Sequence, residues 1–396
     1  MSATIILDFL SDPMGGLLAS ACAFLNRVRA LDAESRFVVL EVNGALSARV
    51  DDAAAFDWVN VASAGGLHGV RRLLWQNGQL PRIAKRYDAT VYLSLSHYLP
   101  LLPSKVCTII GVSNLAPFSA DAYAVESAWR GRLRLRVLHR TILRACRRAD
   151  RVVALSEACR AELAARGIDA GKISVIPNGV SRPPQSEAPL PLPEPIRGRE
   201  FILCVSHFYR YKNYERLVRA YALLADSVRR GRTLLLVGAP YDTGYLEKVR
   251  GLIGVLGLAS EVEIIPGVYG TALVELYRRC AVFAFPSLIE NSPITLLEAM
   301  INGAPVAAAD IPAMREMGGD AIVYFDPHNE HDLARALEKL LADAPRRELM
   351  RRRGMERARA YSWDSFTRRL VQLYRELYAE QIAGPATANS GKEHVR

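Results

Sequence analysis

The sequence lacks the features that define several protein classes. Its six cysteines are scattered and form no Cys-x-x-Cys pair, which excludes a zinc finger and a dithiol redox motif. No apolar run approaches the roughly 20 residues that a membrane-spanning helix needs. Met1–Leu10 carries no basic segment, so it predicts a strand and not a signal peptide. Cysteines among apolar neighbours, as in Phe201–Val205, indicate reduced core residues, and we expect a cytoplasmic protein.

Composition and charge narrow the remaining classes. Half of the 396 residues are hydrophobic and 23% are charged, which is ordinary for a globular protein and excludes a disordered chain. The length predicts two to three domains. The net charge is +10, and the part up to Glu187 carries 23 basic minus 16 acidic residues, or +7. This surplus is explained by a nucleic acid, a membrane or an anionic ligand as partner, or it has no particular function.

Short apolar runs alternate with helix-period segments along most of the chain, which predicts parallel α/β sheets. Six prolines within 183–195 cannot build a helix or a central strand, so this segment predicts a stiff linker between two domains. We expect strands at 3–7, 37–42, 91–95, 106–110 and 151–155 before it, and at 201–205, 233–238, 262–265, 281–285 and 305–309 after it. We expect helices at 214–229, 294–302 and 363–379. Two such domains leave a cleft between them, where ligands of α/β folds bind.

The segment Phe285–Met300 is the most informative. A strand ends at Pro286, a polar loop follows, and a helix begins near Pro293, a residue favoured in the first turn. Free N–H groups at a helix start suit phosphate. Glu290 and Glu298 flank that point and are good acceptors for sugar hydroxyls. On spacing alone, the favoured interpretation is that Glu290 is an ordinary loop acid and Glu298 an ordinary helical acid.

Two further loops follow strands and fit the same cleft. Arg210 and Lys212 lie in the loop after the first strand of the second domain, within reach of a diphosphate. Gly15 and Gly16 follow the first strand of the first domain, where glycine lets backbone approach a ligand. Taken alone, a basic loop is usually just solvated, and a Gly-Gly pair more often forms a plain turn.

These segments, in this order, resemble the family-4 glycosyltransferases, which are retaining enzymes of the GT-B fold with two Rossmann-like α/β domains facing each other across a cleft. The resemblance covers essentially the whole chain. It rests on Gly15-Gly16, the segment Ile173–Val180, Lys212-Asn213, the acids Glu290 and Glu298 with Asn302–Val306, and Tyr361–Trp363.

The resemblance implies roles for particular residues. In the family the first acid contacts the donor sugar, the second binds the ribose, and an arginine and a lysine hold the diphosphate. By position these are Glu290, Glu298 and Lys212, whereas His207 occupies the arginine slot and Arg210 is expected to supply the missing charge. The rest of the expected donor site comprises Gly15, Gly16, Asn291, Ser292, Ile294 and Thr295, where Asn291-Ser292-Pro293 replaces the family's glycine–aromatic–glycine. Asn114 lies near the place of an absent family histidine, and His97, which follows a predicted strand end, is a second weak acceptor-side candidate.

The implied reaction moves a hexose, mannose being one candidate, from a nucleotide-diphosphate sugar to a glycan or lipid-linked acceptor. The family offers bacterial surface-polysaccharide assembly as the natural setting. No Asp-x-Asp pair stands at a strand end, so we expect neither a metal ion nor any other cofactor. A nucleotide-sugar-binding partner subunit without transferase activity is the alternative, and an epimerase, a phosphorylase and a nucleic-acid binder rank lower.

An arginine-rich segment accounts for most of the basic surplus. Nine arginines lie between Arg130 and Arg151, opposed only by Asp150, and five of them recur every four residues along one face. Leu135, Leu138, Ile142 and Cys146 form another face, which predicts an amphipathic helix. Adsorption to an anionic membrane, at its inner face, and a solvated surface helix explain this pattern equally well.

The predicted organisation has five parts. We assign 1–182 to an acceptor-binding domain, 183–199 to the linker, 200–362 to the donor domain, 363–382 to a helix that returns to the first domain, and 383–396 to a polar tail.

Overall fold

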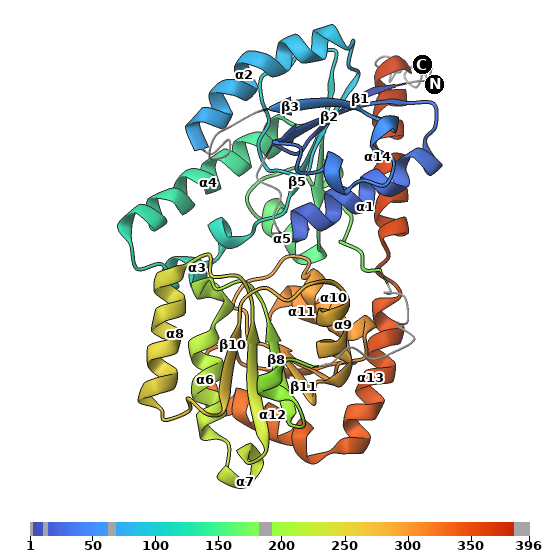
Figure 1. Ribbon diagram of the computed structural model, residues 1–396. Coiled ribbons are helices and arrows are strands. Elements are labelled where there is room, and N and C mark those ends of the chain that lie inside the picture. The colour runs from blue at the N-terminus through green and yellow to red at the C-terminus, as the bar shows by residue number, and fades with distance from the viewer. Residues whose placement is uncertain (1–2, 11–14, 62–68, 182–191, 384–396) are drawn as a thin grey trace, which may run out of the picture.

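A computed structural model describes residues 3–10, 15–61, 69–181 and 192–383. They form two α/β units, each built on one parallel sheet (Figure 1). The first sheet has the strand order β3-β2-β1-β4-β5-β6-β7. Its strands are β1 Thr4–Asp8, β2 Arg36–Val42, β3 Asp57–Val61, β4 Val91–Ser94, β5 Cys107–Val112, β6 Arg151–Ala154 and β7 Ile173–Val175.

The second sheet has the order β10-β9-β8-β11-β12-β13. Its strands are β8 Glu200–Val205, β9 Arg232–Val237, β10 Val262–Ile265, β11 Val282–Phe285, β12 Val306–Ala309 and β13 Val323–Phe325. Most central strands are buried on both faces, which explains their continuous apolar sequences. In both sheets the first strand in sequence lies centrally, at the switch point where ligands of such folds bind.

Helices cover both sheets (Figure 1). Those of the first unit are α1 Gly16–Leu31, α2 Gly69–Arg86, α3 Ala120–Val125, α4 Trp129–Arg148 and α5 Glu157–Ala164. Those that follow are α6 Tyr214–Leu223, α7 Asp226–Arg229, α8 Thr243–Val255, α9 Gly270–Arg279, α10 Ile294–Ile301, α11 Pro312–Gly318, α12 Glu330–Ala342, α13 Ala344–Ala358 and α14 Trp363–Ala383. Within the described ranges, no helix is both long and apolar enough to cross a membrane.

The last helix, α14, packs against α1 of the first unit. Phe366 and Leu370 lie in the same buried cluster as Phe24, and the Tyr374 hydroxyl donates to Asp32 Oδ2 at 2.5 Å. Two chain segments therefore cross between the units, one at Val180 and one near Tyr361, and they touch where Val180 N donates to Tyr361 O at 2.9 Å.

The two parallel α/β sheets confirm the predicted fold class. Three short strands, β3, β7 and β13, were not predicted, and the helix expected over 214–229 is broken between α6 and α7. The basic helix is shorter than the predicted segment because α4 ends at Arg148. Arg151 instead begins β6 and pairs with Glu380 of α14 at 2.6 Å. Residues 182–191, which hold much of the predicted linker, lie outside the described residues.

Candidate functional site

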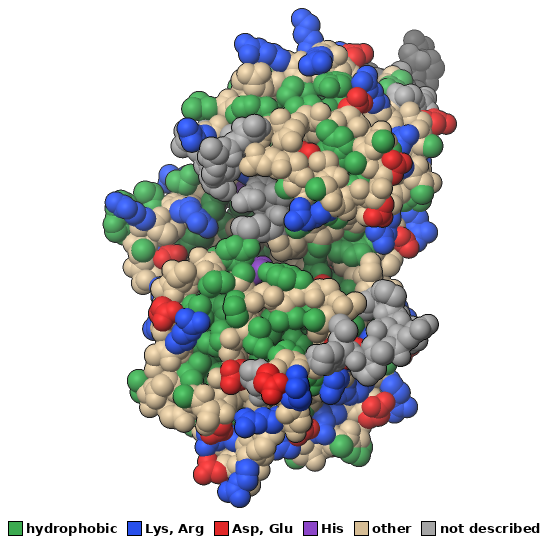
Figure 2. All heavy atoms as spheres, in the orientation of Figure 1, with side chains coloured by type: hydrophobic (Ala, Val, Ile, Leu, Met, Phe, Trp, Pro, Cys, Tyr) green, Lys and Arg blue, Asp and Glu red, His purple; other side chains and the backbone are tan. Residues whose placement is uncertain are grey.

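A cavity of about 950 Å³ lies between the two units, at the carboxyl ends of their strands. Both units line it, and Figure 2 shows the molecule hollowed between its two halves. From the first unit come residues such as Gly15, Gly16, Ser113 and Asn178. From the second come His207, Lys212, Glu290, Asn291, Ser292, Ile294, Thr295 and Glu298. The cavity therefore collects most of the predicted donor site.

A largely buried ion pair lies in the wall of this cavity. Lys212 ends a short 3₁₀ turn after β8, and Glu290 lies in the loop after β11. Lys212 Nζ lies 2.5 Å from Glu290 Oε1, and the two side chains are only 13% and 11% exposed. Burial on its own lowers the pKa of Lys212, but the adjacent Glu290 carboxylate outweighs it, and the net pKa is raised. Lys212 is therefore a cation held in place by a carboxylate.

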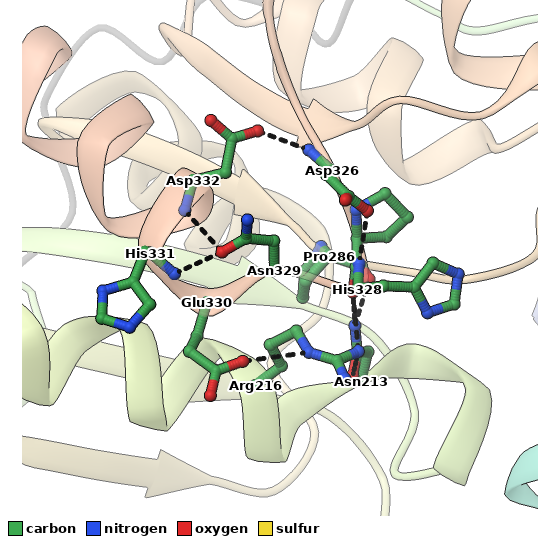
Figure 3. A network of polar contacts seen from close by, with 10 residues as sticks. Asn213, Arg216, Pro286, Asp326, His328, Asn329, Glu330, His331 and Asp332 are labelled. Atoms are coloured by element: carbon green, nitrogen blue, oxygen red, sulfur yellow. Dashed lines mark hydrogen bonds and ion pairs between the residues drawn. The ribbon is translucent and has the colours of Figure 1, made fainter.

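A polar network fixes the loops that carry this pair (Figure 3). Asn213 adopts a left-handed conformation, with φ of 62°, and its Nδ2 donates to Pro286 O at 3.1 Å and Pro327 O at 2.9 Å. Arg216 Nη1 donates to the same Pro327 carbonyl at 2.7 Å. Asn213 thus ties together the loops after β8, β11 and β13, which sets the backbone next to Lys212 and just before Glu290.

Asn291 and Ser292 connect the second unit to the first unit. Asn291 Nδ2 donates to Val112 O at 2.8 Å, and its Oδ1 accepts from Ser156 Oγ at 2.9 Å. Ser292 Oγ accepts from Asn178 N, and Ser292 O accepts from Asn178 Nδ2, each at 3.0 Å. These bonds form an interdomain clasp, so the side-chain amide of Asn291 and the Oγ and carbonyl oxygens of Ser292 already have partners.

Glu298 lies on α10 in a low-dielectric part of the cavity wall. The Tyr277 hydroxyl donates to Glu298 Oε2 at 3.3 Å. Burial raises the pKa of Glu298 to about 7, and the Tyr277 hydrogen bond opposes this only in part. Its charge is therefore sensitive to any ligand that adds or removes water around it. Ile294 and Thr295 form the first turn of the same helix.

The glycine pair of the first unit lies directly against the second unit. A Cβ on Gly15 would lie 3.4 Å from His207 Nε2, and one on Gly16 would lie 3.4 Å from Ile294 Cδ1. Gly15 also has φ of 56° and ψ of −128°, a conformation open to glycine. His207 Nδ1 is buried without a hydrogen-bond partner, and burial together with Lys212 lowers the pKa of this ring, so His207 is neutral.

Three predicted residues do not line the cavity. Arg210 points instead to Asp242, with Nε 3.3 Å from Oδ2. Asn114 Oδ1 accepts from Ala116 N at 2.9 Å and so closes a local turn. The Nδ1 atom of His97 is buried in the first unit beyond the end of β4.

Several lining residues were missed from the sequence. Gly238, Ala239 and Tyr241 follow β9, and Gly267–Tyr269 follows β10. The sequence could have predicted them, because the loops after β9 and β10 leave the same edge of the sheet as the loops after β8 and β11, which carry Lys212 and Glu290. Tyr209 stacks on both Tyr211 and Tyr241, with ring centroids 5.7 Å apart in each pair. Among the residues described, no group of three or more His, Cys, Asp or Glu side chains is placed to hold a metal ion.

Two family models of known proteins match this chain, one over each unit. The family model described as "Glycosyltransferase Family 4" matches residues 14–182, and that described as "Glycosyl transferases group 1" matches residues 193–357. Together they cover most of the chain.

Curated relatives match parts of the chain. It is 30% identical over 198 residues to the serotype-specific mannosyltransferase WbdA of Escherichia coli, covering 48% of this chain and 24% of that protein. It is 34% identical over 172 residues to a D-inositol 3-phosphate glycosyltransferase of Salinispora tropica, covering 41% of this chain and 36% of that protein. The matches thus span about a quarter to a third of the relatives' own lengths.

Solved structures match the fold over nearly the whole chain. Sucrose-phosphate synthase from Thermosynechococcus elongatus superposes with a TM-score of 0.76 at 19% identity, covering 96% of this chain and all of that one. WaaG, a glycosyltransferase involved in lipopolysaccharide biosynthesis, superposes with a TM-score of 0.73 at 19% identity, covering 93% and 99%.

Proposed function

The chain belongs to glycosyltransferase family 4, and from that premise we propose that it is a retaining hexosyltransferase that uses a nucleotide-diphosphate sugar. The observation that carries this proposal is the Lys212–Glu290 pair, held in a cavity lined by both α/β units. The proposed acceptor is a glycan or a lipid-linked glycan, and the proposed setting is bacterial surface-polysaccharide assembly. The mannosyltransferase among the relatives supports mannose as the first candidate sugar.

The donor diphosphate needs positive charge where its leaving group develops negative charge. Lys212 supplies a fixed ammonium, and the start of α10 at Ile294 supplies free N–H groups beside it. We propose that these groups stabilise the departing nucleoside diphosphate without a metal ion. The diphosphate then accepts the proton of the attacking acceptor hydroxyl on the same face of the sugar.

Two carboxylates complete the proposed donor site. Glu290 has a second oxygen beside the one that contacts Lys212, and we propose that it accepts a hydroxyl of the donor sugar. Glu298 is proposed to bind the ribose hydroxyls, in which case the ligand must stabilise its ionised form. Neutral His207 cannot replace the cation of the family's arginine, and Arg210 is engaged with Asp242. Lys212 is therefore the side-chain cation that we assign to the diphosphate, together with the N–H groups at the start of α10.

A partner subunit that binds nucleotide-sugar without turnover is the second candidate. The clasp favours it, because the side-chain amide of Asn291 and the Oγ of Ser292 already have partners in the first unit. A thermal-shift panel of UDP-, GDP- and ADP-sugars identifies the donor, since a ligand that binds only the folded state raises the unfolding midpoint. Binding followed by release of nucleoside diphosphate supports the enzyme. Binding without release supports the subunit, and no binding by any member contradicts both.

We also propose that α4 rests on an anionic membrane. Trp129, Leu133 and Val137 recur every four residues and are 68%, 49% and 55% exposed, so they form an apolar stripe facing solvent. Exposed arginines such as Arg130, Arg134, Arg136 and Arg140 flank this stripe. The predicted inner face is buried at Leu135, Ile142 and Cys146. An apolar stripe with basic edges suits the lipid interface, where each basic residue adds about 1 kcal/mol.

Vesicle sedimentation tests this contact. Replacing Trp129, Leu133 and Val137 together with Gln is expected to release the chain from vesicles that contain phosphatidylglycerol. The matched control replaces three exposed apolar residues of other helices, Leu223, Val255 and Ile382, with Gln. Equal sedimentation of the two triple variants contradicts the membrane proposal.

A further inference from the structure

Three tyrosines of the second unit line the interdomain cavity as a group. Tyr209 and Tyr211 lie in the loop after β8, and Tyr241 lies in the loop after β9. The Tyr209 ring makes interplanar angles of 10° with Tyr211 and 11° with Tyr241, with centroids 5.7 Å apart in each pair. Nearly parallel rings at this separation are offset, so each ring leaves part of its face uncovered by the others. We call these three residues the tyrosine ladder.

The tyrosine ladder begins beside the ion pair that is proposed to serve the donor. Lys212 Nζ lies 5.1 Å from the centroid of the Tyr211 ring. Tyr209 and Tyr211 are half-buried, whereas Tyr241 is 41% exposed. The ladder therefore runs from the Lys212–Glu290 pair to the rim of the cavity, and a ligand held on it has one end at the reacting centre.

The ladder and the proposed ribose site lie over opposite faces of the second sheet. The loops that carry the ladder lead into α6 and α8, which pack on each other over one face (Figure 1). Glu298 lies on α10, which packs with α9 over the other face, and its hydrogen-bond partner Tyr277 belongs to α9. A nucleoside held through its ribose at Glu298 therefore lies toward α9 and leaves the ladder to the acceptor.

Helices of the first unit lie next to the ladder. α3 lies against the turn Arg210–Lys212, and α4 follows α3 in the sequence. Burial raises the pKa of Tyr209 and of Tyr211, and the positive charge of Arg134 on α4 is close enough to oppose this in part. The ladder thus connects the reacting centre to the helix that is proposed to rest on a membrane, the side from which a lipid-linked acceptor arrives.

The chemistry of the ladder favours a sugar ring as its occupant. The C–H bonds on one face of a pyranose carry partial positive charge, which suits the negative face of an aromatic ring. The hydroxyls at the edge of the pyranose match neutral tyrosine hydroxyls, which both donate and accept hydrogen bonds. An alkyl chain makes no use of the tyrosine hydroxyls, and a diphosphate has no positive edge for an aromatic face.

We propose that Tyr209, Tyr211 and Tyr241 form an acceptor subsite that stacks a pyranose ring of the glycan receiving the sugar. This inference rests on the proposed transferase function, since it assigns the group that attacks the donor. It places the acceptor ring in the same cavity as Lys212 and Glu290, on the α4 side of that pair. The acceptor hydroxyl is thereby brought to the donor sugar that is proposed to lie at Glu290.

Saturation-transfer NMR on the full chain tests the subsite without turnover. Aromatic protons of the protein are irradiated in separate samples with methyl α-D-mannopyranoside, methyl α-D-glucopyranoside and methyl α-D-galactopyranoside. Ring C–H protons of at least one glycoside are expected to receive the saturation, because they lie against the tyrosine rings. Tyr209→Leu and Tyr241→Leu are each expected to weaken that binding about three- to tenfold, the equivalent of one lost aromatic contact.

Matched variants separate this role from a structural one. Tyr241→Phe keeps the aromatic ring and is expected to keep most of the binding. Tyr269→Leu removes another tyrosine of the cavity wall, in the loop that leads into α9, and is expected to leave glycoside binding unchanged. Because Tyr241 is exposed, the unfolding midpoint of Tyr241→Leu is expected to match that of the wild type.

Several results overturn the inference. They are no saturation on any glycoside, wild-type binding in both leucine variants, or a loss in Tyr269→Leu as large as theirs. Displacement of the glycoside by UDP or GDP also overturns it, because the ladder then holds the nucleobase. Saturation that reaches only the alkyl protons of octyl β-D-glucopyranoside overturns it in favour of a lipid chain.

The proposed function fails in a different measurement. Failure of every nucleotide-sugar to bind contradicts that function and leaves the glycoside measurements unaffected. Release of nucleoside diphosphate by a wild type that binds no glycoside overturns the acceptor subsite alone.

Discussion

Glu290→Gln is expected to destabilise the protein while sparing nucleotide binding. The Lys212–Glu290 contact is 2.5 Å long and both side chains are nearly buried. Removing one charge of a buried pair costs about 3–5 kcal/mol, and the amide oxygen of glutamine still accepts from Lys212, so we take the lower end of about 3 kcal/mol. For a unit of this size that corresponds to a loss of about 6–12 °C in the unfolding midpoint.

Nucleoside diphosphate restores the missing negative charge beside Lys212. UDP or GDP, whichever binds the wild type, is therefore expected to stabilise Glu290→Gln at least as strongly. Sugar transfer is expected to fall by about 100-fold or more, because a charge-stabilising group at the reacting sugar is lost. Thermal denaturation with and without nucleotide, beside a transfer assay, measures both effects.

Two variants control this prediction. Glu380→Gln breaks the more exposed Arg151–Glu380 pair and is expected to cost no more than about 1 kcal/mol. The double variant Lys212→Met, Glu290→Gln removes both charges and is expected to be more stable than Glu290→Gln. An unchanged midpoint in Glu290→Gln, or a loss of nucleotide binding equal to its loss of transfer, refutes the reasoning.

Three further predictions follow from single contacts. Burial raises the pKa of Glu298 from 4.5 to about 7, so the folded state holds the proton more tightly and the wild type loses stability as pH rises through that window. Melting curves from pH 5 to 8 are expected to show that the free energy of unfolding of Glu298→Gln rises above that of the wild type by up to about 3 kcal/mol as the pH increases. The same dependence of stability on pH in both proteins contradicts this prediction. Gly15→Ala is expected to lower the free energy of unfolding by about 1–3 kcal/mol, because alanine is strained in the backbone conformation of Gly15. It is also expected to reduce sugar transfer, because the added Cβ crowds His207. Gly78→Ala, in open space on α2, is the control and is expected to be neutral or stabilising in the same melt. Asn291→Ala removes two interdomain hydrogen bonds, and small-angle scattering is expected to show a larger radius of gyration; an unchanged radius contradicts a role in holding the units together.

Most strands that the sequence predicts are buried on both faces, because burial leaves a continuous apolar run. The exception is β10, a partly exposed edge strand that was predicted because Val262, Ile264 and Ile265 keep it apolar. β3 was missed because it is a partly exposed edge strand that carries Asp57 and Asn60. β7 and β13 were missed because three residues are too few for a recognisable pattern. Breaks within a helix, as between α6 and α7, likewise leave little trace in hydrophobic periodicity.

The candidate site was predictable where it follows strand ends and unpredictable where it depends on tertiary partners. Lys212 and Glu290 both follow strands of one sheet, so sequence alone places them at one edge. The orientation of Arg210 could not be predicted from its own loop, because its partner Asp242 follows a different strand, β9. Asn291 contacts Val112 and Ser156, which are 179 and 135 residues away, and no local pattern encodes such bonds.

The central claim is that the Lys212 cavity transfers a sugar from a nucleotide-sugar. The most direct test is the release of nucleoside diphosphate from the sugar nucleotide that gives the largest thermal shift, in the wild type and in Lys212→Met. We expect steady release by the wild type and a loss of about 100-fold or more in the variant. No release by the wild type, or equal release by both proteins, contradicts the claim.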